Sequence, residues 1–168
     1  MTREVEDREV IEAEAERLGG AIYGTIVTAG VLVAAGDPSG GAPADAVDAG
    51  IYAVVTTAVF WLAHGLSHAL ARRAAGHPEA TARAALRRDW PMVAGTGPLL
   101  AIMAVASLLG ASDESAISAA VWGSMVVLGL LGLDIARREG ASGMGAVLTV
   151  LACAALGGLL VLLKVIVH

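Results

Sequence analysis

Two histidines spaced four residues apart are the side chains of this sequence best suited to chemistry. His64 and His68 lie in an apolar stretch in which residues 60–68 read Phe-Trp-Leu-Ala-His-Gly-Leu-Ser-His. In a helix, spacings of three and four place Trp61, His64 and His68 on one face. Two imidazoles at this spacing can relay a proton or offer two nitrogens to a metal ion.

Asp134 is a third candidate, in a later apolar stretch and three residues before Arg137. Two interpretations stay open for it. It is either an acid at a membrane interface that pairs with Arg137 or Arg138, or the carboxylate partner of the histidines. The position of His68, four residues before Arg72, likewise suits a headgroup contact and a functional role equally.

Thr96 stands in the segment Gly95-Thr-Gly-Pro98. Pro98 donates no backbone hydrogen bond and clashes with the carbonyl of Ala94, so this helix is predicted to kink or open here. Carbonyls freed at membrane depth can bind ions, as in the broken helices of transporters, although a kink without a ligand is also common. We expect Thr96, His64, His68 and Asp134 at similar depth, as an ion or proton pathway.

A metal centre is not expected. His64, His68 and Asp134 would supply three ligands and an open position, but Arg72 and Arg73 lie within two turns and oppose a divalent cation. The short catalytic motifs of P-loop, CxxC, HExxH or GxSxG type do not occur. The sequence therefore predicts no cofactor, and it favours a protein that is not an enzyme.

The elements that carry these residues are predicted to be membrane-spanning helices. Of the 168 residues, 57% are hydrophobic and 16% are charged, which suits neither a soluble domain nor a disordered chain. About 20 apolar residues are needed to cross a bilayer. Five continuous runs meet this need, so we predict an all-α, polytopic membrane helix bundle with spans at residues 19–36, 51–71, 91–109, 116–136 and 142–167.

Charge sets the predicted orientation. In this five-span scheme every arginine falls on one side, because the connections at 37–50 and 110–115 carry acids and no base. The positive-inside rule then places the N-terminus in the cytoplasm. Arginine in place of lysine almost everywhere, with many alanines, glycines and valines, suggests a bacterial source, so the expected location is the bacterial inner membrane. A net charge of −5 argues against a nucleic-acid partner, so the bilayer is the partner that the composition implies.

Residues 1–18 are predicted to form an acidic cytoplasmic helix that runs into the bundle of residues 19–168. Gly20 and Gly24 form a GxxxG pair, which lets helices pack closely. We assign Gly20, Gly24 and Trp61 to packing or assembly, and the pair also hints at a homo-oligomer.

In three segments the chain resembles small uncharacterised integral membrane proteins of actinobacteria. These are Glu16-Arg-Leu-Gly-Gly-Ala-Ile-Tyr-Gly24, Trp61-Leu-Ala-His64 and Leu163-Lys-Val-Ile-Val-His168. The resemblance implies no activity. A fainter similarity, on Arg17, Trp61 and His64, is to the bacterial relatives of the lysosomal potassium channel, although Ala21-Ile-Tyr replaces the Phe-Ser-Asp signature of that family and the number of spans differs.

Two functions are carried forward from the sequence. The first is passage of ions or protons by a homo-oligomer, since ionisable and loosened backbone groups share one depth. The second is a membrane scaffold or accessory subunit that binds a protein partner at its cytoplasmic face, through the acidic N-terminal helix and the arginine-rich segment 72–88.

Overall fold

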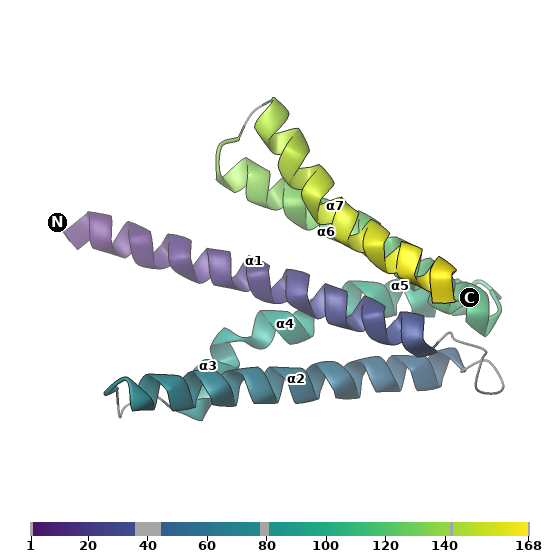
Figure 1. Ribbon diagram of the computed structural model, residues 1–168, viewed down its shortest axis with the longest axis horizontal. Helices are drawn as coiled ribbons and strands as arrows, with labels where there is room; N and C mark the ends of the chain where they lie inside the picture. Colours follow the sequence, from purple (N-terminus) through teal and green to yellow (C-terminus); the bar gives the residue numbers. More distant parts are fainter. Residues whose placement is uncertain (1, 36–44, 78–80, 142, 168) are drawn as a thin grey trace.

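All regular structure in the described part of the chain is helical. The computed structural model describes residues 2–35, 45–77, 81–141 and 143–167. Its helices are α1 (Thr2–Ala35), α2 (Ala46–Ala74), α3 (Ala82–Arg88), α4 (Trp90–Ala94), α5 (Gly97–Leu108), α6 (Asp113–Arg138) and α7 (Met144–Val167) (Figure 1).

The prediction of an all-α membrane bundle with five spans is confirmed. Five helical segments are long and apolar enough to cross a bilayer, and α4 and α5 together make the third of them. These segments are Glu14–Ala35, Ala46–Ala74, Trp90–Leu108, Asp113–Arg138 and Met144–Leu162. The protein is therefore a polytopic integral membrane protein.

Side-chain caps start two of the spans earlier than predicted. The Asp45 carboxylate accepts from the Val47 backbone N–H at 2.8 Å, and α2 thus begins five residues before the apolar run. The Ser112 hydroxyl accepts from the Ser115 N–H at 3.3 Å in front of α6. Such caps satisfy backbone donors that the first turn of a helix leaves free.

The predicted N-terminal helix and the first span form one unbroken helix. At 34 residues, α1 is about 51 Å long, which exceeds the thickness of a hydrocarbon core by about 20 Å. Its N-terminal part projects past the ends of α2 and α6 (Figure 1). Residue 18 thus marks a change of composition and not a boundary in the structure.

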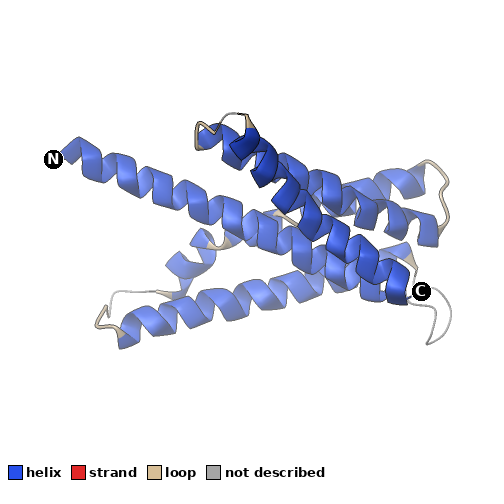
Figure 2. Cartoon of the chain, turned by 45° about the horizontal axis from the view of Figure 1, so that its top comes forward, coloured by secondary structure: helices blue, strands red, loops and turns tan. Residues whose placement is uncertain are grey.

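Small residues allow the helices to pack closely. A cluster of buried alanines surrounds fully buried side chains such as Leu32, Leu99 and Ile117, where α1, α2, α5 and α6 meet; the alanines are Ala29, Ala46, Ala49, Ala53, Ala116 and Ala120. The helices diverge toward the N-terminus and remain close at the other end (Figure 2). Many large apolar side chains on the outer surface are exposed, as expected of a surface that faces lipid.

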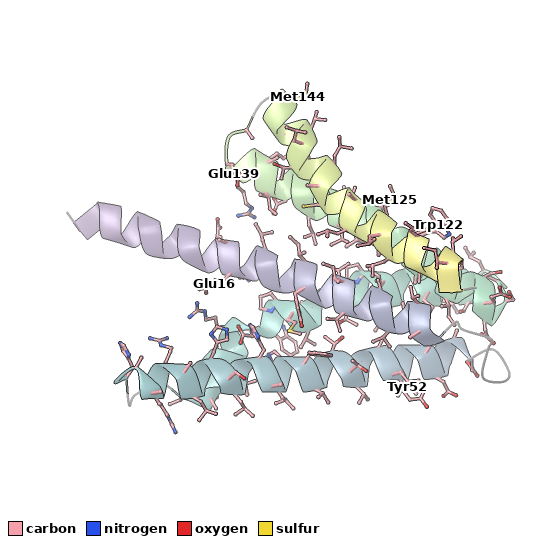
Figure 3. All side chains as sticks on the ribbon, in the orientation of Figure 1. Glu16, Tyr52, Trp122, Met125, Glu139 and Met144 are labelled. Carbon is pink, nitrogen blue, oxygen red and sulfur yellow. The ribbon has the colours of Figure 1, made fainter. Side chains whose placement is uncertain are left out.

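The start of α1, the end of α2, the end of α6 and the start of α7 are all directed toward one end of the bundle, which we name the arginine-rich end (Figure 1). Side-chain nitrogens gather there over the end of α2 and over α3, whereas Tyr52 and Trp122 lie toward the opposite end (Figure 3). This arrangement agrees with the prediction that the arginines lie on one side of the membrane.

One helix in this region was not expected from the sequence. Residues 72–88 were treated as a connection, but their second half forms α3. The Thr81 hydroxyl caps α3 by accepting from the Ala84 N–H at 3.2 Å.

Candidate functional site

The two histidines line a groove between α1, α2 and the turn from α3 to α4. We name this hollow of about 350 Å³ the histidine groove; it is lined by Glu16, Gly19, Gly20, Tyr23, His64, His68, Arg88, Asp89 and Met92. It lies at the arginine-rich end of the bundle. Helix α2 provides the imidazoles, α1 provides one wall, and the start of the broken span provides the other.

The imidazoles contact each other and an aromatic ring of α1. The ring centroids of His64 and His68 are 4.5 Å apart, at an interplanar angle of 65°. Tyr23 stacks on His64 with a centroid distance of 6.4 Å and an angle of 19°. The spacing of four residues therefore places both rings side by side, as predicted from the helical period.

Two carboxylates, Glu16 and Asp89, line the groove with the histidines, and Glu16 is paired with Arg88. Asp89 and His68 line both the histidine groove and a neighbouring hollow of about 200 Å³. The Oδ2 atom of Asp89 is buried and has no hydrogen-bond partner among the described residues. A buried carboxylate oxygen without a donor is costly, so Asp89 Oδ2 is an acceptor that a donor entering the groove could satisfy.

Sequence reasoning missed Asp89, although a signal was present. Asp89 stands directly before Trp90 and Pro91, at the start of the third apolar run. It therefore had to lie at the same membrane depth as the end of α2. Asp134, in contrast, lies inside an apolar run, where an acid is more conspicuous.

Asp134 has other partners in the structure. Its carboxylate accepts from Arg138 Nε at 2.9 Å, and the NH1 nitrogen of the same arginine donates to Glu14 at 2.8 Å. The ribbon of α1 runs between α2 and the arginine-rich end of α6 (Figure 1). The structure thus places Asp134 with Arg138 and Glu14, on the far side of α1 from the histidines.

The helix break predicted at Pro98 is present, and its polar groups are satisfied from α1. Helix α4 ends at Ala94, and the Thr96 N–H bonds to the Val93 carbonyl at 3.1 Å, three residues back. The Thr25 hydroxyl bonds to the Gly95 carbonyl at 3.1 Å and to the carbonyl of Ala21 in its own helix at 2.9 Å. The Gly95 carbonyl at the helix break is thereby hydrogen-bonded within the protein and does not face lipid.

Four hydroxyls form a buried group next to this break, which we name the threonine cluster: Thr25, Thr28, Thr57 and Thr96. The Thr28 hydroxyl donates to Thr96 at 3.0 Å and lies 3.4 Å from the hydroxyl of Thr57. All four are between 0 and 4% exposed. The cluster joins α1, α2 and the third span, and only Thr96 was selected as a candidate from the sequence.

Gly20 and Gly24 face α4 of the same chain. A Cβ atom on Gly24 would overlap the carbonyl oxygen of Met92, and one on Gly20 would lie 3.3 Å from the Met92 nitrogen. Across the same contact, a Cβ on Gly95 would overlap the carbonyl of Ala21. The GxxxG face that hinted at dimerisation is therefore occupied within the chain.

Trp61 faces away from the groove, toward α3 and α4. Its indole N–H donates to the Leu86 carbonyl at 2.9 Å, and its ring meets Trp90 edge-on at 5.8 Å. A Cβ on Gly65 would lie only 2.7 Å from Leu86 Cδ2. The absence of a side chain at Gly65 thus lets α3 pack against α2, with Trp61 fixing it from one side.

The described residues contain no group of three histidine, cysteine or carboxylate side chains arranged to hold a metal ion. The groove instead offers two imidazoles, a phenol, a guanidinium and two carboxylates. No family model, curated protein or solved structure matches this chain. Fold and site together define a five-span α-helical membrane protein with a titratable groove at its arginine-rich end.

Proposed function

We propose that the protein passes protons across the membrane, along a path that begins in the histidine groove. The observation that carries this proposal is the buried, unpartnered Oδ2 atom of Asp89 beside His68. Imidazole and carboxylate groups exchange protons near neutral pH. At this end of the bundle they would be reached from the cytoplasm, given the orientation predicted from the arginines.

The threonine cluster supports protons over hydrated ions as the transported species. Its hydroxyls are bonded to one another or to backbone carbonyls and are almost completely buried. A hydrated ion needs a water-filled route, whereas a proton can move along hydrogen-bonded groups. At the helix break, the Gly95 carbonyl and the Thr96 hydroxyl continue the polar groups of the groove toward the centre of the bundle.

Beyond the cluster the bundle is closed by apolar side chains. Leu32, Leu99 and Ile117 are at most 1% exposed and belong to the common core of the four packed helices. Passage therefore requires these helices to separate at the end opposite the groove. The polar groove and the apolar core would then open in turn, so that the proton path is open to one side of the membrane at a time.

Proton flux into liposomes tests the proposal. The full chain is reconstituted with an internal pH-sensitive dye, and a potassium gradient with valinomycin drives protons inward. Asp89→Asn and His68→Gln are each expected to lower the flux on the order of a hundred-fold, because each removes a positioned proton acceptor. Asp134→Asn and His77→Gln are the matched controls, and both are expected to retain the flux.

Each result decides a different part of the proposal. Flux no greater than in protein-free liposomes would refute proton passage. Flux that survives both Asp89→Asn and His68→Gln would remove the groove from the path. Loss of flux in Asp134→Asn would favour the path first expected from the sequence, with Asp134 in place of Asp89.

The homo-oligomer expected from the sequence needs a surface other than the occupied Gly20 and Gly24 face. The exposed apolar side of α7 is the surface we propose, because this helix contacts mainly α6. Chemical cross-linking in the same liposomes counts the copies. A single-copy band at every protein-to-lipid ratio would contradict assembly.

A second function is supported by the projecting end of α1. The N-terminal part of α1 extends past the ends of α2 and α6 (Figure 1), and residues 2–13 of this helix include Glu4, Glu6, Asp7, Glu9 and Glu12. A helix that extends outside the bundle suits an accessory subunit that holds a basic partner. Deletion of residues 2–12 should leave flux unchanged but abolish co-purification of such a partner from the native membrane.

A further inference from the structure

A separate hollow lies on the opposite side of α3 from the histidine groove. It has a volume of about 640 Å³ and is lined by Trp61, Arg83, Leu86, Arg87 and Trp90. We name it the tryptophan–arginine pocket. It is independent of the proposed proton path.

The walls of this pocket are held in place by contacts already described. Trp61 is bonded to the Leu86 carbonyl and packs edge-on against Trp90, and Leu86 rests on the bare backbone of Gly65. Two aromatic rings from different spans and one aliphatic side chain therefore make a fixed apolar wall. An acyl chain or another apolar group would fit against such a surface.

Two arginines on α3 supply the polar side of the pocket. Arg88, the third arginine of this helix, forms an ion pair with Glu16 of α1. Arg83 and Arg87 are four residues apart, so they share a helix face, and neither forms an ion pair with a carboxylate among the described residues. Two adjacent guanidinium groups match the oxygens of a phosphate.

The depth of the pocket in the membrane determines which ligands can reach it. It lies at the arginine-rich end, where the third span begins, and Trp90 is 55% exposed. Exposed tryptophans at the ends of spans sit at the level of the lipid headgroups. The pocket therefore presents positive charge at headgroup level and an apolar wall below it.

We propose that the tryptophan–arginine pocket binds one anionic phospholipid. Arg83 and Arg87 hold the phosphate, and the first part of an acyl chain lies along Trp61 and Trp90. A soluble phosphate would use the arginines and leave the aromatic wall uncovered. A lipid of zero net charge would leave both positive charges uncompensated, whereas a lipid with one negative charge leaves only one, so the site selects for headgroup charge.

Quenching of tryptophan fluorescence by brominated lipids tests this assignment. The full chain, carrying Trp122→Phe so that only the pocket tryptophans report, is reconstituted with brominated phosphatidylglycerol or brominated phosphatidylcholine. The relative binding constant of the two lipids is the measured quantity. We expect a preference for phosphatidylglycerol of about 25-fold, since each arginine near the surface contributes about five-fold.

Arg83→Gln with Arg87→Gln is expected to abolish this preference. Arg72→Gln with Arg137→Gln removes the same charge from the same end of the bundle, at residues that do not line the pocket. This pair should leave the preference within about two-fold, because screening confines each exposed charge to its surroundings. If the variant with Arg83→Gln and Arg87→Gln does not fold, the salt dependence of the lipid preference is measured in the protein with both arginines intact. Raising NaCl from about 0.05 M to about 0.5 M should reduce the preference several-fold.

Four results would overturn the proposal. Equal quenching by both lipids would show that the pocket does not select headgroup charge. An equal loss in both arginine pairs would show that it reports diffuse surface charge only. Relief of quenching by millimolar glycerol phosphate would assign the pocket to a soluble phosphate, and relief by an acidic peptide would assign it to a protein partner.

Discussion

A methyl group added at Gly24 should disrupt the contact between α1 and α4. The Cβ atom of an alanine there would overlap the carbonyl oxygen of Met92 and lie 2.8 Å from its carbonyl carbon and 3.2 Å from its Cα. All three atoms belong to the backbone, so no rotamer change relieves the clash. Ordinary contact begins at 3.4 Å, and the two helices must therefore separate by more than half an ångström.

The cost follows from this displacement. A radial gap of half an ångström to one ångström forfeits about a quarter to a half of the dispersion energy of each contact. Overpacking of a well-packed interface costs about 1–3 kcal/mol. Against this, alanine gains about 0.8–1 kcal/mol over glycine inside a helix. We therefore expect Gly24→Ala to lower the free energy of unfolding by up to about 2 kcal/mol.

Gly30→Ala is the matched control, because it makes the same change on the same helix where no atom lies within 4 Å of the added Cβ. It should raise the free energy of unfolding by about 0.5–1 kcal/mol. Both values come from SDS titration in mixed micelles, followed by the helical circular dichroism signal. Each free energy of unfolding is extrapolated to zero SDS, and systematic errors of this extrapolation cancel in the difference between the two variants.

Equal stabilities of Gly24→Ala and Gly30→Ala would refute the close contact of α1 with α4. Cross-linking of the same samples adds a second criterion. If Gly24→Ala shifts the protein from a larger to a smaller assembly while the unfolding free energy of each chain stays constant, the GxxxG face is used between chains and not within one.

Three further predictions use the same preparations. In a Cys153→Ser background, an impermeant thiol reagent added outside whole cells should label Ala111→Cys and not His77→Cys; the reverse pattern would invert the orientation. Arg138→Gln releases both of its carboxylate partners but should lower the midpoint of SDS-induced unfolding only slightly, because both ion pairs are exposed, and a large loss would indicate desolvated pairs. Thr28→Val keeps the shape of the side chain and removes its hydroxyl, which should cost about 0.6–1.7 kcal/mol; no measurable loss would show that the threonine cluster adds no stability.

The spans were predictable because length and composition alone determine which segments a bilayer accepts. Continuous apolar runs predicted five spans whose ends lie within five residues of the observed ones, and the Asp45 cap accounts for the earlier start of α2. The break before Pro98 was also predictable, since the missing backbone donor acts locally.

The partners of the candidate residues were not predictable, because they depend on which faces of which helices meet. His64 and His68 share a face through the helical period, but their neighbour is Asp89 and not Asp134. Nothing local in the sequence indicates that α1 passes between α2 and the end of α6. Thr25 and Thr57 were overlooked for the same reason: a threonine in an apolar run gains significance only when another helix brings a polar group to it.

The broken third span has a consequence for the order in which the chain is built into the membrane. Its exposed carbonyl at Gly95 is covered by the Thr25 hydroxyl, a residue 70 positions earlier in the chain. Synthesis starts at the N-terminus, so α1 and α2 already lie in the bilayer when residues 90–108 leave the ribosome. The Gly95 carbonyl can therefore accept a hydrogen bond from Thr25 as soon as the third span inserts, and it does not face lipid without a donor. A chain permuted so that the third span came first would have to insert its free carbonyl before any partner had been made, at a cost of several kcal/mol.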